Sequence, residues 1–218
     1  MSSGLFQKDY WERKALAERR PPSHPVVRHF ALSKIREVQR TLGLQPGVKL
    51  LDLGCGNGFF SQPFSELCWT VGVDFSNRLL QANPLALKAG MDANHLAFQD
   101  MAFDVVFCHA LLHHVEDPGK VLSEMGRVSR KYVVVMEPNR ANPFMWLFSA
   151  LVPEERAALK FSLGYLRELL EKNHLRVVEA FSHGFIVPNK TPTFLLPFLK
   201  PLDRRNPWGM TNILIAEK

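Results

Sequence analysis

The sequence contains few cysteines, and they are too scattered to form a disulfide framework or a zinc site. The chain has three of them, Cys55, Cys68 and Cys108, and none is close in sequence to another. Small disulfide-stapled domains and zinc-binding modules need closely spaced cysteines. We therefore expect a reducing, cytoplasmic setting and no bound metal.

Long apolar runs are also missing. The uncharged stretches 141–153 and 191–199 are the longest of interest, and both are shorter than the roughly 20 residues that cross a bilayer. Residues 1–14 contain no apolar core of a secretory signal. These two shortages predict no transmembrane segment, and they leave open a peripheral contact with a membrane.

Acidic residues are outnumbered, and the basic excess is confined to the two ends of the chain. Residues 1–40 hold nine Lys/Arg and four Asp/Glu, and residues 190–218 hold five and two, whereas the middle of the chain is slightly acidic. A basic surface can attract nucleic acid, anionic membrane or acidic substrate. Because no RNA-binding module is recognisable, a nucleic-acid partner is not expected.

Apolar residues are plentiful, and their pattern predicts an α/β fold. With 218 residues and 46% hydrophobic content, the chain can bury one sizeable core. Strand-like apolar runs alternate with helical patterns, which favours a parallel sheet with helices on both faces. The expected strands are a short one before Gly54 and then 70–74, 85–91, 103–108, 131–137, 175–185 and 212–216, and the expected helices are 26–42, 59–67, 118–129 and 154–173.

A glycine-rich stretch follows the first of these strands and precedes a helix. Gly54, Gly56 and Gly58 allow a sharp turn and leave the backbone open to a ligand. Asp52 lies two residues before the first glycine, at the end of the strand. A carboxylate there repels a dinucleotide's pyrophosphate and suits a ligand with a positive charge or an amine.

The stretch LDLGCGNG (residues 51–58) resembles the first motif of class I S-adenosylmethionine-dependent methyltransferases of the small-molecule type, and the resemblance continues for about a hundred residues. It implies a Rossmann-like, doubly wound, mostly parallel sheet of seven strands with an antiparallel last strand. The implied organisation is an N-terminal helical cap (1–42) and a methyltransferase domain (43–218). Insertions at 138–165 and 184–209 would form a substrate lid.

The resemblance also implies which residues hold the cofactor. Asp74 ends the second strand at the offset where dinucleotide folds place an acid on the ribose hydroxyls, and here it would bind the ribose of the adenosyl group. Asp92 and Ala93 would contact the adenine. The full set expected at S-adenosylmethionine, or at its product S-adenosylhomocysteine, is Asp52, Gly54, Cys55, Gly56, Gly58, Asp74, Phe75, Asp92, Ala93, Cys108 and Tyr10.

Three histidines follow the fourth strand and are candidates for the chemistry. Methyl transfer needs donor and acceptor held in line, and a base helps where the acceptor loses a proton. The segment LHHVEDP resembles the family stretch in which the second histidine recurs, and this points to His114 and, less directly, to His113. The alternative is that His114 only shapes the loop. His109, Glu137 and Asn139 are candidates for contact with the acceptor.

The acceptor itself is expected to be a small hydrophobic or lipid-linked molecule, because both lid insertions are rich in Phe, Leu, Trp and Pro. Packing of a simple apolar cap would explain the same composition. Two other functions stay open at this stage. The chain could methylate RNA or protein, or it could be a relative that binds the cofactor without catalysis.

Overall fold

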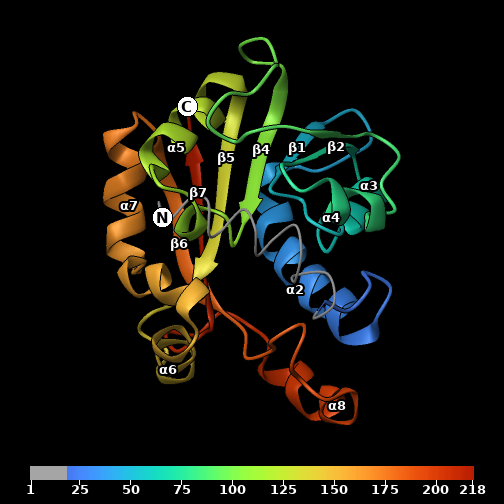
Figure 1. Ribbon diagram of the computed structural model, residues 1–218, viewed down its shortest axis with the longest axis vertical. Helices are drawn as coiled ribbons and strands as arrows, with labels where there is room; N and C mark the ends of the chain where they lie inside the picture. Colours follow the sequence, from blue (N-terminus) through green and yellow to red (C-terminus); the bar gives the residue numbers. More distant parts are fainter. Residues whose placement is uncertain (1–18) are drawn as a thin grey trace.

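The computed structural model describes residues 19–218, and these residues build one seven-stranded sheet with helices on both faces (Figure 1). The strand order is β3-β2-β1-β4-β5-β7-β6. The strands are β1 (Lys49–Leu53), β2 (Trp69–Asp74), β3 (Lys88–Gly90), β4 (Phe103–His109), β5 (Ser129–Pro138), β6 (Arg176–His183) and β7 (Thr211–Glu217). The helices are α2 (Pro25–Leu42), α3 (Ser61–Ser65), α4 (Asn77–Ala82), α5 (Pro118–Val128), α6 (Pro143–Leu151), α7 (Leu163–Lys172) and α8 (Leu196–Leu199), with 3-10 turns η2 (Leu112–His114), η3 (Pro153–Lys160), η4 (Thr193–Leu195) and η5 (Lys200–Leu202).

The pairing of the strands confirms the expected fold class. Strands β1 to β5 pair in parallel with their neighbours, whereas β7 runs antiparallel to both β5 and β6. The chain order switches between β1 and β4, where connections leave to opposite sides. In open sheets of this kind, ligands bind beyond the carboxyl ends of the strands at such a switch.

Two apolar cores cover the two faces of the sheet. Along β4, Val105 and Phe107 pack into the core shared with α2 and α3, whereas Val106 and Cys108 pack into the core shared with α5 and α7. A central parallel strand buried on both faces reads as a continuous apolar run. This explains why the sequence 103–108 predicts its strand so clearly.

The third strand and one helix differ from expectation. The strand expected at 85–91 is reduced to β3, because the Asn83 side chain accepts a hydrogen bond from Leu85 N at 2.9 Å and holds that backbone in a turn. The helix expected at 154–173 is broken into η3 and α7. Phe161 leaves the helical conformation, and Ser162 caps a new helix by accepting from Tyr165 N at 3.1 Å.

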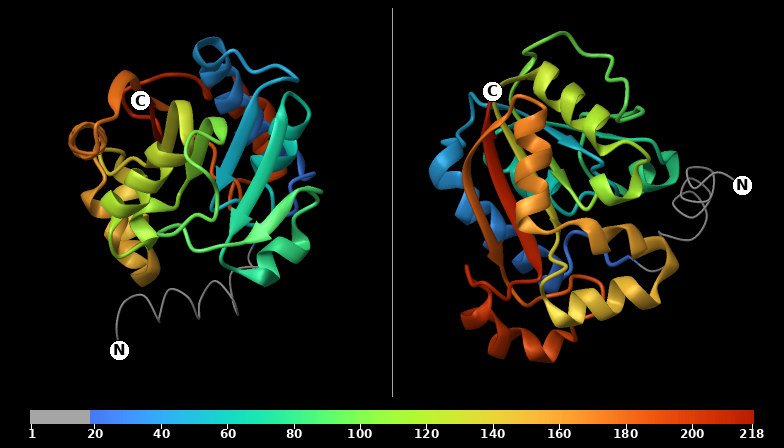
Figure 2. Two further views of the ribbon diagram at one scale, coloured as in Figure 1. Left: turned by 90° about the horizontal axis from the view of Figure 1, so that it is seen from above. Right: turned by 90° about the vertical axis from the view of Figure 1, so that its left-hand side faces the viewer.

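The two insertions that were expected to form a lid contain short helices that the sequence pattern did not predict. Helix α6 begins after Asn142, whose Oδ1 accepts hydrogen bonds from Phe144 N and Met145 N, both at 3.0 Å. The segment 184–209 holds only η4, α8 and η5, each of four residues or fewer, because its prolines interrupt longer helices. The right-hand view of Figure 2 shows α6 and the α8 region at the same end of the molecule.

The described part of the chain contains no helix that is both long and apolar enough to cross a bilayer.

Candidate functional site

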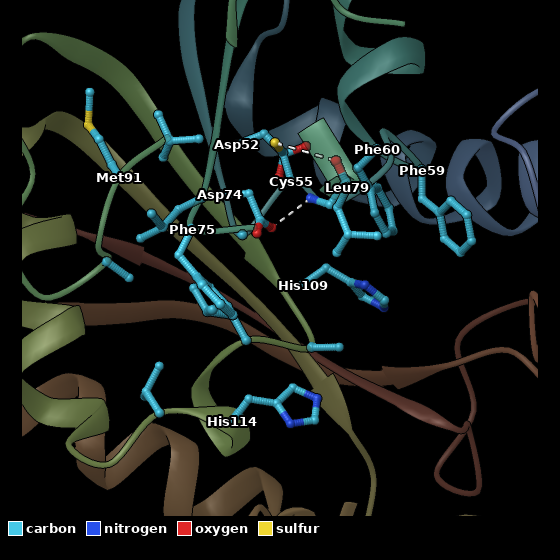
Figure 3. Close-up of a pocket in the computed structure, with 18 of the residues that line it drawn as sticks. Asp52, Cys55, Phe59, Phe60, Asp74, Phe75, Leu79, Met91, His109 and His114 are labelled. Carbon is cyan, nitrogen blue, oxygen red and sulfur yellow. Dashed lines mark hydrogen bonds between the residues drawn. The ribbon is translucent and has the colours of Figure 1, made fainter. Parts of the chain in front are cut away.

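A cavity of about 830 Å³ lies at the carboxyl ends of β1, β2 and β4, where the strand order switches. Figure 3 shows residues of its lining. A cavity of this size falls within the range that binds cofactors and small ligands. Ten of the residues expected at the site line it: Asp52, Gly54, Cys55, Gly56, Asp74, Phe75, Asp92, Ala93, His109 and His114.

The glycine-rich loop turns tightly between β1 and α3. Gly58 has a φ of +96°, and a Cβ there would lie 2.7 Å from Asn83 Oδ1, so a larger residue would displace the loop. Asn83 also donates from Nδ2 to Gly56 O at 3.0 Å. The end of α4 therefore holds the loop in shape, and Gly58 serves the turn rather than the cavity lining.

Asp74 ends β2 with its carboxylate already oriented. Oδ2 accepts from Gly56 N at 2.9 Å, and Oδ1 accepts from Ser76 N at 2.8 Å; the first of these bonds is drawn in Figure 3. An ionised carboxylate offers about four acceptor positions. Two backbone donors therefore fix the orientation of this carboxylate at the cavity wall.

Asp52 is the second carboxylate of the cavity and is almost completely buried. Ser61 Oγ donates to its Oδ2 at 2.5 Å. Burial and the nearby charge of Asp74 together raise the pKa of Asp52 to about 7, against the hydrogen bond from Ser61, which lowers it. Near neutral pH this group can be protonated or ionised, and a cation in the cavity would favour the ionised form.

At the edge beyond β3, Asp92 and Ala93 line the cavity together with Met91. Asp92 Oδ1 accepts from Asn94 N at 2.9 Å and from Asn94 Nδ2 at 2.8 Å. The backbone bond from Asn94 lowers the pKa of Asp92, so this carboxylate is ionised. It is an exposed acceptor at the rim, beside apolar side chains.

His109 and His114 project toward the pocket in Figure 3. Burial, together with nearby cations, lowers the pKa of His109 to about 3 and that of His114 well below its usual value. The rings of Phe30 and Phe60 lie 5.5 and 4.8 Å from the ring of His109. Both histidines are therefore neutral at physiological pH.

His113 lies behind the lining, between two carboxylates. Its Nδ1 lies 2.5 Å from Glu137 Oε2, and its Nε2 lies 3.1 Å from Glu155 Oε2. Burial opposes a charge on His113, but the two acids outweigh it and raise the pKa to about 10. This imidazolium has no lone pair with which to accept a proton. Potential ligand atoms of His113, His114 and Glu155 lie within 4.8 Å of one another.

Glu137 also accepts from Leu111 N at 3.0 Å and from Leu112 N at 2.7 Å. Its carboxylate thus connects the end of β5 to the turn that follows β4. The side chain is fully buried and does not line the cavity. In this position Glu137 shapes the wall that carries His114.

Two further expected residues, Cys108 and Asn139, do not line the cavity. Cys108 is buried in the core between the sheet and α5, and burial raises the pKa of its thiol. Asn139 is buried and donates to Gly209 O at 2.8 Å, which joins β5 to the second lid segment. Tyr10 is outside the described residues.

Several lining residues were not singled out from the sequence. Phe148, Val187, Pro188 and Asn189 reach the cavity from the two lid insertions, so the sequence indicated the segments but not the residues. Val115, Glu116 and Asp117 of the segment LHHVEDP line it as well, as does Glu155 of the first insertion. Arg19, Phe59, Phe60, Leu79, Met91, Asn94, His95, Ala110, Leu111 and Lys120 also line it, and no motif marks them.

Comparison with known proteins shows that the chain is similar to methyltransferases. The family model described as "Methyltransferase domain" matches residues 51–135. A demethylmenaquinone methyltransferase of Streptomyces avermitilis is 35% identical over 137 residues, which are 56% of this chain and 59% of that protein. The chain thus spans little more than half the length of the curated relatives that it matches.

Two solved structures share the fold over their full length. A Thermotoga maritima protein described as a SAM-dependent methyltransferase, possible histamine N-methyltransferase, has a TM-score of 0.69 at 21% identity, with 100% of both chains covered. Magnesium protoporphyrin IX methyltransferase of Synechocystis with bound SAM has a TM-score of 0.63 at 15% identity, covering 100% of this chain and 98% of that one.

The matched segment contains the glycine-rich loop, Asp74 and the histidines after β4, and it lies in a sheet of the expected strand order. Residues 51–135 are therefore similar to the methyltransferase-domain family, and the described part of the chain has the fold of the S-adenosylmethionine-dependent methyltransferases among the solved structures.

Proposed function

We propose that this chain binds S-adenosylmethionine in the cavity and transfers its methyl group to a small, hydrophobic or lipid-linked acceptor. The observation that carries the proposal is the pre-oriented carboxylate of Asp74, held by Gly56 N and Ser76 N at the cavity wall. An oriented acceptor next to a glycine-rich turn suits the vicinal hydroxyls of a ribose.

The charges of the cavity support a cationic donor. Asp52 and Asp74 line the inner part of the cavity, and Asp92 lies at its rim. A sulfonium with an adjacent amine gains attraction from buried carboxylates, because the interior screens charges less than water does. The same carboxylates disfavour a pyrophosphate, so a nicotinamide dinucleotide is the wrong ligand for this pocket.

The transfer itself is a displacement at the methyl carbon. The acceptor atom forms a bond to that carbon while the carbon–sulfur bond breaks, sulfur keeps the electron pair, and the acceptor gives up a proton. The protein contributes mainly alignment and the exclusion of water. His114 is our candidate for the proton acceptor, because it is neutral and faces the cavity; its low pKa suits an acceptor that is already acidic.

The acceptor is proposed from the lid segments. Phe148, Val187 and Pro188 bring apolar surface from both insertions to the cavity. The relative from Streptomyces avermitilis is named for a quinone, and other curated relatives are named for ubiquinone biosynthesis and for phosphatidylethanolamine. A lipid-linked acceptor fits these walls and would bring the protein into peripheral contact with a membrane.

Calorimetric titration tests the cofactor half of the proposal. Purified protein should bind S-adenosylmethionine and S-adenosylhomocysteine saturably and should give no heat with NAD. If neither adenosyl ligand raises the melting temperature or gives saturable heat, the proposal is refuted.

The acceptor half is tested by transfer of a labelled methyl group. Label from S-adenosylmethionine should enter the organic-soluble fraction of a lipid and quinone extract and should not enter RNA or added protein. Incorporation into RNA or protein alone would identify the other acceptor class and overturn the lipid-linked assignment.

A further inference from the structure

Large apolar side chains gather in solvent on the two lid segments. Among the described residues, ten of the fourteen exposed large hydrophobic side chains belong to residues 143–151 and 194–208. We call these ten the lid surface: Phe144, Trp146, Leu147, Phe148, Leu151, Phe194, Leu195, Phe198, Leu202 and Trp208. Surfaces with so much exposed apolar area mark sites of contact with a partner or a membrane.

Helix α6 exposes large apolar side chains and buries a polar one, which is the opposite of an ordinary surface helix. Ser149 is 2% exposed, whereas Phe144 is 73% exposed and Leu151 is 70% exposed. A surface helix of a water-soluble domain places its apolar stripe on the core and its polar residues outward. The arrangement in α6 leaves the apolar stripe without a partner in the described part of the chain.

The second segment shows the same orientation and is firmly attached. Phe194 and Phe198, four residues apart, are both 73% exposed, whereas Leu196 between them is buried in the core below α2. The buried carboxylate of Asp203 lies 3.2 Å from His29 Nε2 of α2. The exposed rings are thus held outward by residues that anchor the segment.

The two segments are joined to each other. Asn142 Nδ2 donates to Trp208 O at 2.6 Å, and the segments lie at the end of the molecule toward which β4 and β5 point (Figures 1 and 2). Phe148 of the first segment lines the cavity, as does Val187 of the insertion 184–209, which contains the second segment. The lid surface therefore borders the proposed active site.

The exposed charged side chains of the segments that carry the lid surface are of one sign. The exposed charged side chains of residues 138–152 and 184–209 are all basic: Arg140, Lys190, Lys200, Arg204 and Arg205. Arg205 is paired with Glu37 and Glu179, and the one acid of these segments, Asp203, is buried. The other four provide positive charge around the apolar side chains.

We propose that the lid surface docks on an anionic lipid bilayer, with its aromatic and aliphatic side chains in the interfacial layer and its basic side chains at the headgroups. Tryptophan, phenylalanine and leucine beside lysine and arginine are the composition that binds such interfaces. A second copy of the chain is a poorer occupant, because a face-to-face pair would bring basic groups together.

Docking would deliver a lipid-linked acceptor directly to the cavity, since Phe148 of the lid surface lines it. This last step rests on the proposed function. The docking itself does not, because vesicle binding can be measured without cofactor or acceptor.

The test is co-sedimentation of the whole chain with vesicles of phosphatidylglycerol and phosphatidylcholine, at low and high salt. We expect binding to the mixed vesicles, at least tenfold weaker binding to pure phosphatidylcholine, and weakening by salt. Phe144→Ser with Phe198→Ser should reduce binding at least tenfold. Leu87→Ser, which removes an exposed leucine next to β3, is the matched control and should bind like the wild type.

A second pair of variants tests the charges. Lys190→Gln with Lys200→Gln should weaken binding to the anionic vesicles, whereas Lys131→Gln with Lys172→Gln removes as much charge from other surfaces and should not. Absence of binding to any vesicle at low salt overturns the proposal. So does a wild-type dimer in solution that the Phe144 and Phe198 changes convert to monomer, since a second copy is then the occupant.

The proposed function fails separately. Vesicle binding without cofactor binding would support the docking surface and refute the methyltransferase proposal. Cofactor binding without vesicle binding would refute the docking surface and leave the methyltransferase proposal standing.

Discussion

Asp74 is the residue on which the proposed recognition of the cofactor depends most directly. Its carboxylate is oriented by two backbone donors, so the proposed hydrogen bonds to ribose hydroxyls need no reorganisation of this group. We expect Asp74→Asn to weaken binding of S-adenosylhomocysteine by roughly 1–3 kcal/mol, the scale of a lost bond to a charged group. Isothermal titration calorimetry measures the change directly.

The matched control for Asp74 is Asp100→Asn. Asp100 is exposed and pairs with Arg127, far from the cavity lining, so this change should leave the affinity as it is. An Asp74→Asn protein that is folded and binds with wild-type affinity would contradict the ribose assignment.

Asp52 predicts that cofactor affinity depends on pH. Its folded-state pKa is raised to about 7, so the ligand-free protein holds a proton on this group below pH 7. A cationic cofactor favours the ionised carboxylate, and binding must therefore release that proton. We expect the affinity for S-adenosylmethionine to rise between pH 6 and 8 and then level off. Calorimetry in buffers of different ionisation enthalpy counts the protons released.

Asp52→Asn separates this effect from the titration of the cofactor's own amine. The variant should bind more weakly at pH 8 and should lose most of the proton release at pH 7. Proton release equal to that of the wild type would assign the titration to another group.

Among the strands and helical turns, His113 links β5, η2 and η3. It lies between Glu137 at the end of β5 and Glu155 in η3, and it belongs to η2 itself. His113→Gln leaves Glu137 buried without its cation, and breaking a buried pair in this way costs roughly 3–5 kcal/mol. Urea denaturation at pH 7 should show this loss, whereas His95→Gln at an exposed position should not.

The contribution of His113 to the free energy of unfolding decreases as the pH rises. The folded-state pKa of His113 is raised from 6.5 to about 10, so its contribution is full below pH 6.5 and is lost as pH rises through 10. The difference in unfolding free energy between wild type and His113→Gln should therefore shrink between pH 7 and 10. A difference that stays constant would show that His113 acts by packing alone.

Elements with a strong local signal could be predicted from the sequence. The run 103–108 is apolar on both faces of a central strand, and helix α2 has its end marked by Gly43 in a left-handed conformation. The strand expected at 85–91 and the helix expected at 154–173 were longer than the structure shows. Asn83 binds the backbone amide of Leu85 with its side chain and keeps it out of the strand, and Ser162 binds the amide of Tyr165 and begins a separate helix.

The candidate site was predictable where each residue follows a strand. Asp52, Asp74 and Asp92 lie at strand ends, and parallel strands bring their carboxyl ends to one edge of the sheet. The role of His113 was not predictable, because its two partners lie 24 and 42 residues away in sequence. Local spacing carries no information on such contacts.

For the molecule as a whole, Arg20 joins parts of the site that are far apart in the chain. Its guanidinium donates to Pro188 O at 3.0 Å and to Thr191 O at 2.7 Å. Its backbone N donates to Asn189 Oδ1 at 3.2 Å, and its carbonyl accepts from Asn57 Nδ2 at 3.0 Å. Arg20 therefore links the glycine-rich loop to the start of the insertion 184–209.

Arg20→Ala should release the second lid segment while the sheet remains folded. Because Pro188 and Asn189 line the cavity, we expect a several-fold loss of affinity for S-adenosylhomocysteine together with faster chymotryptic cleavage near Phe194 and Phe198. Arg20→Lys retains a donor for the two carbonyl groups and should recover part of both effects, whereas Arg36→Ala on the exposed side of α2 should cause neither. Cleavage that is faster without any loss of affinity would show that the lid segment closes the acceptor side of the cavity and makes no contribution to holding the cofactor.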